Sequence, residues 1–428
     1  MSWKKYRLGD ICHIEKGKIG IQKAIPGQFP LVVTAEERLS CNEYHFEGNA
    51  AIIPLVSSTG HGHKSLKRIH FQSGKFAVGN ILCAVLPKDE SFLRADFLYR
   101  FLDLNKEKEL VSRMKGMANV TLPLKEIANI EIPVPPIEDQ ISFVQQYNLL
   151  EEKSFELNEE ITGQLSLVKQ LRQAFLREAL QGKLVPQDPS NEPASVLLEK
   201  IRAEKEQLIR EKKIKKEKTL PPISEHEIPF EIPENWVWCR LGEIAEHNAG
   251  KTMHGSQNTG KERKCITTSN LYWGYFDLKK LKEIRIEEKE LSSCTATKGD
   301  LLICEGGESG RSAIWEYEYD ICFQNHVHRV RPYDGVINYF LYYIMLYLDY
   351  SGQINNYRKG MGISNLSGNA LSSIIHPLPP SAEQKRIVTK LDELMKLCDN
   401  LEASIKESQQ QNELLLQQVL REALEPRN

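Results

Sequence analysis

Few stretches of the chain combine residue types and spacings that could do chemistry. Residues 255–261 (GSQNTGK) have the G-x-x-x-x-G-K spacing of a phosphate-binding loop. The next residue is Glu262, where such a loop needs Ser or Thr for Mg²⁺, and no apolar strand leads into it. The pattern therefore predicts a flexible loop and not a nucleotide site.

Two His-x-His segments and one acidic stretch are the other patterns of this kind. Segments 61–63 and 326–328 would place two imidazoles on one strand face, but no Cys or carboxylate completes a metal set. Asp277 with residues 287–289 loosely resembles the carboxylates and lysine of a nuclease, in a stretch rich in Glu and Lys. Neither a dinucleotide-binding fingerprint nor a recognisable nucleophile site is present. We expect no metal and no cofactor, and the pattern favours a recognition scaffold over an enzyme.

The composition is that of an ordinary globular protein. Of 428 residues, 41% are hydrophobic and 27% charged, with a net charge of −2, which argues against a disordered chain and against a protein that coats nucleic acid. The longest apolar run, Tyr339–Leu348, is shorter than the about 20 residues of a membrane span. The first ten residues hold no signal core, and none of the nine cysteines is spaced C-x-x-C. These features predict a cytoplasmic protein with reduced thiols.

The chain repeats itself, and the repeat sets the organisation of the elements. Four ordered matches recur, the first at an offset of 233 residues and the others at 244: Arg7–Ile11 with Arg240–Ile244, Lys115–Met117 with Lys359–Met361, Pro133–Pro136 with Pro377–Pro380, and LREAL at 176–180 with 420–424. The sequence therefore predicts two copies of one unit, roughly 1–180 and 236–424.

Each copy begins with a mixed part of short apolar runs separated by glycines and polar turns. Runs such as Ala50–Val56, Gly79–Leu86 and Asp300–Cys304 predict strands. Matching Gly79–Leu82 with Gly299–Leu302 gives an offset of 220, which predicts a shared frame with loops of different length. Two domains that recognise two different targets would show such differences in loop length. A duplicated copy that has lost its function and diverged would show them too.

A long helix follows the double proline in each copy. Apolar residues recur at alternating steps of four and three, which is a heptad seam typical of paired helices. The seam residues that we expect to form the helix pair are Phe143, Leu150, Leu157, Ile161, Val168, Phe175, Ile387, Leu391, Leu394, Leu401, Ile405 and Val419. If the helices run antiparallel, a constant number sum of 562 pairs every seam position and places Ser154 opposite Ser408.

Residues 181–235 separate the two copies. Prolines break the chain first, and Val196–Lys218 is then rich in Glu, Lys and Arg at helical i,i+4 spacing. The basic run 212–216 could touch DNA, although such a run is more often a solvated helix face.

Three stretches of this chain resemble the specificity subunit of a type I restriction–modification enzyme. They are the two P-x-P-P-x-x-[DE]-Q helix entries, Pro133–Gln140 and Pro377–Gln384, the stretch QGKLVPQDPSNEPASVLLEKIRAEKEQLIREKKIKK at 181–216, and PENWVWCRLGEI at 233–244. The resemblance covers essentially the whole chain, and the central stretch is its most specific part.

The resemblance implies a fold and a function. It implies an α+β chain with two mixed α/β target recognition domains, 1–137 and 236–380, in a pseudo-two-fold repeat. Two long antiparallel coiled-coil helices, 138–180 and 381–428, act as a spacer, and 181–235 forms a linker with a charged helix. Such a subunit catalyses nothing. It binds double-stranded DNA at a bipartite site and holds two modification subunits, with two restriction subunits docking outside.

The same resemblance directs attention to polar loops as DNA contacts. Arg and Lys favour guanine and Asn favours adenine in the major groove, while the repeated lysines suit phosphates. The expected DNA-binding residues are Ser58, Thr59, His61, His63, Lys64, Lys115, Thr268, Ser269, Asn270, Ser309, Arg311, Asn325, His326 and Lys359. Two other functions stay open from the sequence: a solitary DNA-modifying or DNA-cleaving enzyme with a disguised site, and a coiled-coil adaptor that binds protein.

Overall fold

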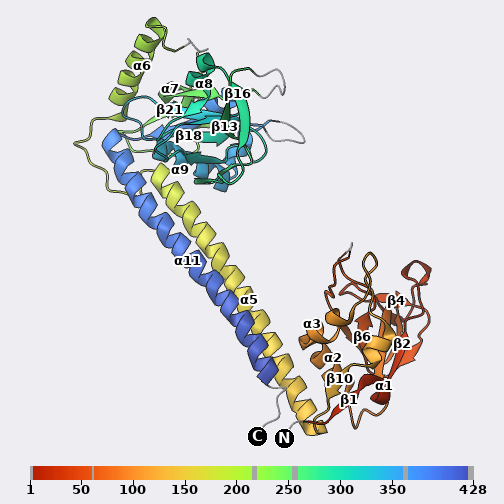
Figure 1. Ribbon diagram of the computed structural model, residues 1–428. Coiled ribbons are helices and arrows are strands. Elements are labelled where there is room, and N and C mark those ends of the chain that lie inside the picture. Colours follow the sequence, from red (N-terminus) through yellow and green to blue (C-terminus); the bar gives the residue numbers. More distant parts are fainter. Residues whose placement is uncertain (1–2, 60–61, 215–218, 253–258, 360–364, 423–428) are drawn as a thin grey trace. The chain divides into compact units, whose positions relative to one another are not determined.

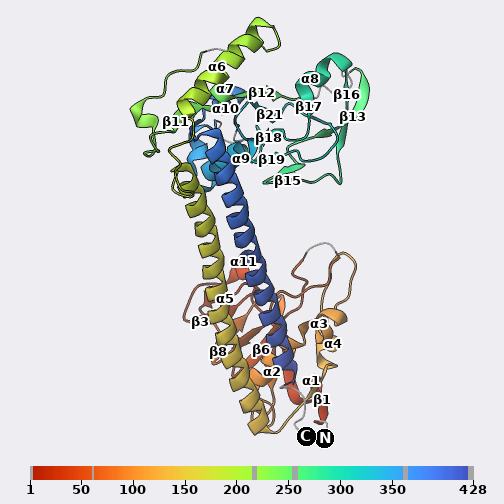
Figure 2. The same cartoon turned by 90° about the vertical axis from the view of Figure 1, so that its left-hand side faces the viewer.

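The computed structural model describes residues 3–59, 62–214, 219–252, 259–359 and 365–422. It contains two compact units (Figures 1 and 2): unit 1 is Met1–Gly163 with Ile405–Asn428, and unit 2 is Gln164–Ser404. Among the described residues, no helix has the length and apolar character to cross a membrane.

Unit 1 is built from two four-stranded sheets. The first has the order β2 (Cys12–Lys16), β9 (Leu82–Pro87), β6 (Ala50–Pro54), β7 (His70–Gln72), and all its neighbours are antiparallel. The second has the order β4 (Leu39–Cys41), β3 (Phe29–Val32), β8 (Lys75–Val78), β5 (Phe46–Glu47), and β3 pairs with β8 in parallel. The remaining elements are β1 (Lys5–Arg7), α1 (Leu8–Ile11), α2 (Ala95–Leu104), α3 (Lys106–Glu109), α4 (Leu124–Ala128), β10 (Glu131–Pro133) and the first part of α5 (Ile137–Leu180).

The two central strands of the first sheet of unit 1, β6 and β9, are apolar at every position and pack on both of their faces. Alternate residues of a strand point to opposite faces. One set packs against the second sheet: Ala50, Ile52, Leu82 and Ala84. The other set packs against α2 and α5: Ala51, Ile53, Cys83 and Val85. This double burial explains why β6 and β9 read as continuous apolar runs.

Unit 2 repeats both sheets. The first sheet has the order β12 (Ala245–Ala249), β21 (Val327–Pro332), β18 (Leu301–Cys304), β19 (Ser312–Ile314). The second has the order β16 (Lys282–Ile286), β13 (Lys261–Ile266), β20 (Ile321–Phe323), β17 (Thr295–Ala296), with β13 and β20 parallel. The hairpin of β14 (Leu271–Tyr272) and β15 (Tyr275–Phe276) has no counterpart among the strands that the structure describes in unit 1. The other elements are α6 (Ala194–Arg210), β11 (Val237–Arg240), α7 (Leu241–Ile244), α8 (Leu291–Cys294), α9 (Asn338–Tyr350), α10 (Gly368–Ser373), β22 (Ile375–Leu378) and the first part of α11 (Ser381–Glu422).

The strand registers correct the alignment made from sequence. Cys12 pairs with Pro87 in unit 1, and Ala245 pairs with Pro332 in unit 2, so β9 corresponds to β21 at an offset of 245. In turn β6 corresponds to β18. The match of Gly79–Leu82 with Gly299–Leu302 was therefore wrong: the first segment leads into β9, whereas the second leads into β18. A short apolar motif fits either strand, and only the pairing distinguishes them.

The double-proline motif is explained by one buried glutamine in each unit. The Gln140 side chain accepts a hydrogen bond from the Arg94 amide (2.9 Å) and donates to the carbonyls of Phe92 (3.0 Å) and Pro135 (2.9 Å). Gln384 likewise accepts from the Ile337 amide (2.9 Å) and donates to the Pro379 carbonyl (3.0 Å). Each amide thus satisfies backbone groups that burial would otherwise leave unpaired, and it joins the long helix to the segment before α2 or α9.

The long helices α5 and α11 lie side by side within each unit. In unit 2, Arg172 contacts Asp399 and Glu402 (2.9 Å each), while Leu176 and Leu180 join a cluster with Leu391. Residues later in α5 thus lie beside residues earlier in α11, so the two helices are antiparallel. In unit 1, Leu416 and Leu420 of α11 pack beside Phe143, Tyr147 and Leu150 of α5. The predicted fold class, α+β with repeated mixed units and long antiparallel helices, is confirmed.

The predicted heptad seam is correct at its start and shifts by one residue further along. The buried or half-buried face of α11 follows Ile387, Leu391, Leu394 and Cys398, and then continues through 402, 405, 409, 412 and 416. In α5 the same shift occurs between Ser154 and Asn158, so Leu157 and Leu401 are 39% and 41% exposed. A straight helix has 3.6 residues per turn, and a strict seven-residue stripe drifts around it. The remaining seam residues, Ile161, Val168, Phe175, Ile405 and Val419, are buried or half-buried.

The predicted number sum of 562 is wrong. It places Arg172 opposite residue 390, whereas its two ion pairs are nine and twelve residues further along α11. At 1.5 Å per residue that is roughly 13–18 Å, beyond the reach of the side chains. Ser408 is also exposed, so the predicted serine layer is not a buried one.

The central segment is held to unit 2 by Glu383, the residue before the buried glutamine. Its carboxylate accepts hydrogen bonds from Trp236 Nε1 (3.0 Å) and Gln187 Nε2 (2.5 Å). Burial raises the pKa of Glu383 above its usual value. The two donors come from the stretches 181–216 and 233–244, so this contact explains why these stretches accompany the proline motif. The expected charged helix is α6, which ends at Arg210, and residues 215–218 lie outside the described part.

Candidate nucleic-acid interface

In unit 1 the polar residues after β6 form a loop held by its own hydroxyl groups. Ser57 Oγ donates to the His63 carbonyl (2.6 Å) and accepts from the Ser65 amide (3.2 Å). Ser58 Oγ accepts from the Lys67 amide (2.8 Å), and the hydroxyls of Thr59 and Ser65 lie 2.9 Å apart.

The candidates of this loop therefore divide into two groups. Ser58 and Thr59 help to fold the loop and remain exposed, while His63 and Lys64 are exposed beyond it. His61 lies outside the described residues.

The second candidate segment of unit 1 lies against this loop. The backbones of Lys115 and Thr121 exchange two hydrogen bonds of 2.8 Å, and the Ser57 amide donates to the Val120 carbonyl (3.0 Å). Lys115 Nζ lies 2.7 Å from Glu126 Oε1, which lowers the pKa of Glu126. Residues about 60 apart in the sequence are thus brought to one surface, with the exposed ammonium of Lys115 at its edge.

Unit 2 builds the same junction with a shorter loop. The Leu366 amide donates to the Glu305 carbonyl (2.7 Å), as the Leu122 amide does to that of Leu55 (2.8 Å) in unit 1. Lys359 and Asn365 exchange backbone hydrogen bonds of 2.9 and 3.0 Å, matching Lys115 and Thr121. Residues 305–311 are therefore the counterpart of the loop after β6, and exposed Lys359 is the counterpart of Lys115.

Three predicted contacts of unit 2 serve instead to hold its loops. Ser309 is fully buried. Asn270 is 5% exposed, and its amide binds the Thr267 amide and the carbonyls of Asp277 and Lys280 at 3.0–3.1 Å. Because both side chains are buried, we no longer expect them to contact DNA.

Arg311 is the third, with its side chain 13% exposed. It donates to the Thr268 carbonyl (2.7 Å), pairs with Glu308 (2.8 Å) and lies over the Tyr272 ring, 4.8 Å from the ring centre. These contacts fix the loop after β13 against the loop after β18. They leave Thr268 half-buried and Ser269 exposed at the surface.

The turn before β21 completes the surface in unit 2. The Glu305 amide donates to the His326 carbonyl (2.9 Å), and the Asn325 amide donates to that of Lys251 (3.0 Å). His326 is exposed, with Nδ1 3.4 Å from the Glu305 carboxylate, and Asn325 is half-exposed. The turn thus brings Asn325 and His326 beside the loop after β18.

Asn80 is the counterpart of Asn325 in unit 1, and sequence reasoning missed it. Its amide donates to the Ile19 carbonyl (2.8 Å), the Leu55 amide donates to the Ile81 carbonyl (2.8 Å), and the Asn80 side chain is exposed. The signal was present at an offset of 245, but the alignment at 220 concealed it.

The predicted His-x-His faces do not form in unit 2. His326 lies in the turn, while His328 is buried, stacks edge-to-face on His247 (5.9 Å) and faces the Leu366 carbonyl (3.2 Å). Within the described ranges, no cluster of His, Cys, Asp and Glu has the arrangement of a metal site.

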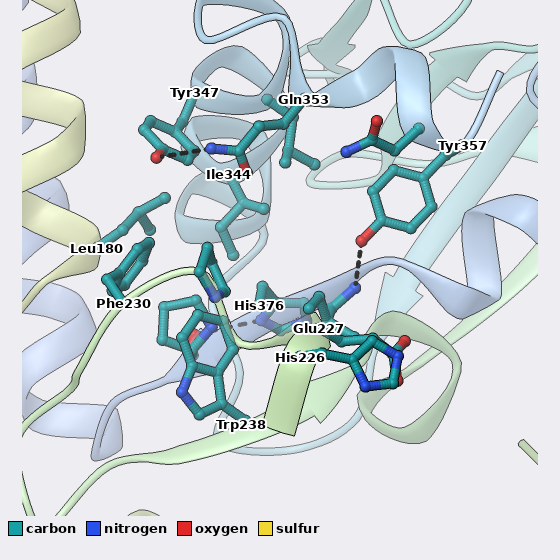
Figure 3. Close-up of a pocket in the computed structure, with 15 residues that line it drawn as sticks. Leu180, His226, Glu227, Phe230, Trp238, Ile344, Tyr347, Gln353, Tyr357 and His376 are labelled. Carbon is teal, nitrogen blue, oxygen red and sulfur yellow. Dashed lines mark hydrogen bonds between the residues drawn. The ribbon is translucent and has the colours of Figure 1, made fainter. Parts of the chain in front are cut away.

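Unit 2 also contains a cavity of about 250 Å³ away from these loops (Figure 3). Aromatic side chains line it, including Phe230, Trp238 and Tyr347. Two pairs of its polar groups are engaged: Gln353 donates to the Tyr347 hydroxyl (3.1 Å), and the Tyr357 hydroxyl accepts from the Ile375 amide (3.2 Å). Burial lowers the pKa of His376 to about 4, so this imidazole is neutral at pH 7. The side chains that line this cavity pack the linker, residues 181–235, against the rest of unit 2.

Both units of the chain match one protein family. The family model, described as the type I restriction modification DNA specificity domain, matches residues 1–166 and 233–410. The chain belongs to this family. The two matched ranges follow the internal repeat, so each unit corresponds to one specificity domain.

Relatives within the specificity family include several named subunits. The chain is 30% identical to the Escherichia coli type I restriction enzyme EcoAI specificity subunit over 375 residues, which is 76% of this chain and 63% of that protein. It is 32% identical to the E. coli EcoEI specificity subunit over 59% of this chain and 44% of that protein. The chain thus spans under two thirds of these relatives. With the E. coli EcoDI specificity subunit the identity is 22%, over 99% of this chain and 88% of that protein.

Solved structures share the fold of this specificity-family chain. A chain from a study of complex assembly and conformational transition of the type I R-M system superposes with a TM-score of 0.69, at 18% identity, over 99% of this chain and 98% of that chain. The HsdS subunit of Thermoanaerobacter tengcongensis superposes with a TM-score of 0.56, at 18% identity, over 99% and 96%.

Proposed function

We propose that this chain is the DNA sequence-recognition subunit of a type I restriction–modification complex. It binds a bipartite, asymmetric site in double-stranded DNA, with one half read by residues 1–137 and the other by residues 236–380. The long helices, 138–180 and 381–428, set the separation of the two half-sites, and 181–235 links the two copies. The subunit contributes recognition, while chemistry belongs to its partners.

One observation carries this proposal. The loop after the equivalent strands β6 and β18 is clamped by the same backbone bonds in both units, but it spans residues 55–69 in unit 1 and only 305–311 in unit 2. A common frame with two different loops suits the reading of two different half-sites, because base edges are read by side chains carried on loops or elements of fixed position.

The surface groups suit this role. In unit 1 they are Ser58, Thr59, His63, Lys64, Asn80 and Lys115, and in unit 2 they are Thr268, Ser269, Asn325, His326 and Lys359. Asparagine is able to bind adenine bidentately, and lysine neutralises phosphate. The proposed partners are two modification subunits and two restriction subunits. No cofactor is assigned to this chain.

Methylation-aware sequencing of a host that expresses the chain with its modification partners tests the proposal. We expect a two-part motif with a fixed gap. Exchanging residues 1–137 for the corresponding domain of another family member is expected to change one half of the motif and to leave the other. A change of both halves would contradict the assignment of one half-site to each unit.

Experiments with the purified chain and its partner subunits distinguish DNA recognition from the two other functions, an enzyme and a protein adaptor. Cleavage or methylation of DNA by the purified chain alone, with Mg²⁺ and S-adenosylmethionine, would favour an enzyme. Assembly with partner subunits but no sequence-dependent DNA binding would favour a protein adaptor.

A further inference from the structure

Met117 is the most exposed of the large apolar side chains that the structure describes. It is 94% exposed, whereas the next, Leu414, is 66% exposed. It lies at the tip of the loop that joins Lys115 to Thr121, beside the loop after β6. Isolated exposed apolar residues are common on proteins. Exposure alone therefore does not indicate a function for Met117, and its backbone support and its neighbours have to be considered.

The tip is held in place by backbone contacts on three sides. The two Lys115–Thr121 hydrogen bonds close the loop at its base. Gly116 has φ of +111°, and a Cβ there would meet the Asn119 carbonyl oxygen at 2.3 Å. A Cβ on Gly62 would meet the Met117 carbonyl oxygen at 2.5 Å. The loop after β6 therefore supports the backbone of Met117 directly, and only glycine permits this approach.

The surroundings of Met117 are polar and basic. Lys115 precedes it, and His63 and Lys64 follow the supporting Gly62; all three are exposed. A protein-binding hot spot is typically a packed cluster of residues such as Trp, Tyr and Arg. One apolar side chain on a fixed backbone, flanked by cations, instead has the form of the wedges that some proteins insert between base pairs.

The triplet is shared by both copies although the neighbouring loops differ. Lys115-Gly116-Met117 recurs as residues 359–361 at the offset of the double-proline motif. Residues 360–364 lie outside the described part, so the structural argument rests on Met117. A feature kept while the reading loops change suits a contact that does not depend on base identity.

We propose that Met117 is an apolar wedge that enters the base stack of the half-site bound by unit 1. The inference rests on the proposed DNA recognition. Methionine is flexible and polarisable, so it fits between different base pairs. Partial unstacking at one step would lower the cost for a partner enzyme that must extrude a base.

The test uses the full chain assembled with its modification subunits and a duplex of its own motif. Single 2-aminopurine substitutions placed along the half-site report unstacking as increased fluorescence. We expect an increase at one step with the unchanged protein, its loss with Met117→Ala, and its retention with Met117→Leu. Affinity for the duplex is expected to fall about tenfold with Met117→Ala, a loss of about 1.4 kcal/mol, with the methylated motif unchanged.

Ile25→Ala is the matched control, since Ile25 is also in unit 1, is 62% exposed and lies outside the loops of the proposed interface; it should leave the fluorescence unchanged. Unaltered fluorescence with Met117→Ala would overturn the wedge while leaving DNA recognition intact. Loss of subunit assembly with Met117→Ala would also overturn it, in favour of a protein contact. Absence of DNA binding by the unchanged complex would refute the proposed function itself.

Discussion

Replacing Arg311 by alanine distinguishes a residue that holds loops together from one that reads a base. In the structure its guanidinium donates to the Thr268 carbonyl, pairs with Glu308 and covers the Tyr272 ring. All three partners belong to unit 2, and two of them lie in the region of the loop after β13. Removing the side chain therefore separates two loops that form the proposed interface.

The expected loss of stability follows from these contacts. The charge-assisted hydrogen bond to the carbonyl of half-buried Thr268 is worth about 1.5–3 kcal/mol, and the cation–π contact adds about 0.5–1 kcal/mol. Glu308 is 72% exposed, so its ion pair adds at most about 1 kcal/mol. Together these give a destabilisation of about 2–5 kcal/mol. Arg311→Lys is expected to recover only a small part, because an ammonium lacks the planar fork.

Denaturant unfolding of the purified chain, followed with a probe in unit 2, measures this loss. Arg285→Ala is the matched control: Arg285 is 60% exposed and lies 3.3 Å from Glu262, so its removal should change stability by under about 0.5 kcal/mol. Methylation-aware sequencing adds the second readout. If Arg311→Ala leaves stability unchanged and relaxes a single base of the motif, Arg311 reads a base and the structural assignment fails.

Three further predictions concern the frame, the charges and pH. Gln140→Ala and Gln384→Ala should each destabilise their own unit by about 2–4 kcal/mol in denaturant unfolding, because each leaves buried backbone groups unpaired; a loss under about 1 kcal/mol would contradict this. Lys115→Ala and Lys359→Ala should weaken binding equally across DNA sequences and make the salt dependence shallower by about one, whereas a changed motif with an unchanged slope would exclude phosphate contacts. Burial lowers the pKa of His376 to about 4, below its usual value of about 6.5. The unfolded chain therefore binds a proton between these values that the folded chain does not. Stability from this group is present above pH 6.5 and is lost as pH falls towards 4, by about 3 kcal/mol; His376→Leu should flatten thermal stability against pH over this range, and an unaltered profile would refute it.

The repeat, the long helices and the family could be predicted from the sequence because each depends on patterns of neighbouring residues. The steps of four and three in 387–398 and the proline entry at Pro377 are set by neighbouring residues alone. The alignment of Gly79–Leu82 failed because a Gly-polar-apolar-apolar segment is compatible with either of two strands. The predicted seam was wrong at Leu401 because a seven-residue repeat assumes 3.5 residues per turn, whereas a straight helix has 3.6. The difference is small over one or two turns and moves the stripe off the buried face further along.

The interface could be located by region but not by side chain. Polar residues in loops either bind a ligand or satisfy the loop itself, and the two roles use the same residue types. Asn270 and Ser309 belong to the second role because other segments bury them: Asn270 binds the carbonyls of Asp277 and Lys280, and Arg358 donates to the Ser309 carbonyl. Asn80 is identified as the counterpart of Asn325 only by the pairing of β2 with β9 and of β12 with β21. These facts depend on contacts between distant segments, which no local pattern contains.

The clamped loops have a consequence for how such proteins diversify. In each unit the segment after β6 or β18 leaves the sheet at a residue that is held by backbone bonds and by no side chain: Leu55 bonds with Ile81 and Leu122, and Glu305 bonds with His326 and Leu366. Mutation cannot easily remove bonds of this kind, and a surface segment can change length at small entropic cost. Lineages are thus free to insert, delete or exchange residues in the segment while inheriting the fold intact, so new binding preferences can arise in one half of the molecule without a period of instability.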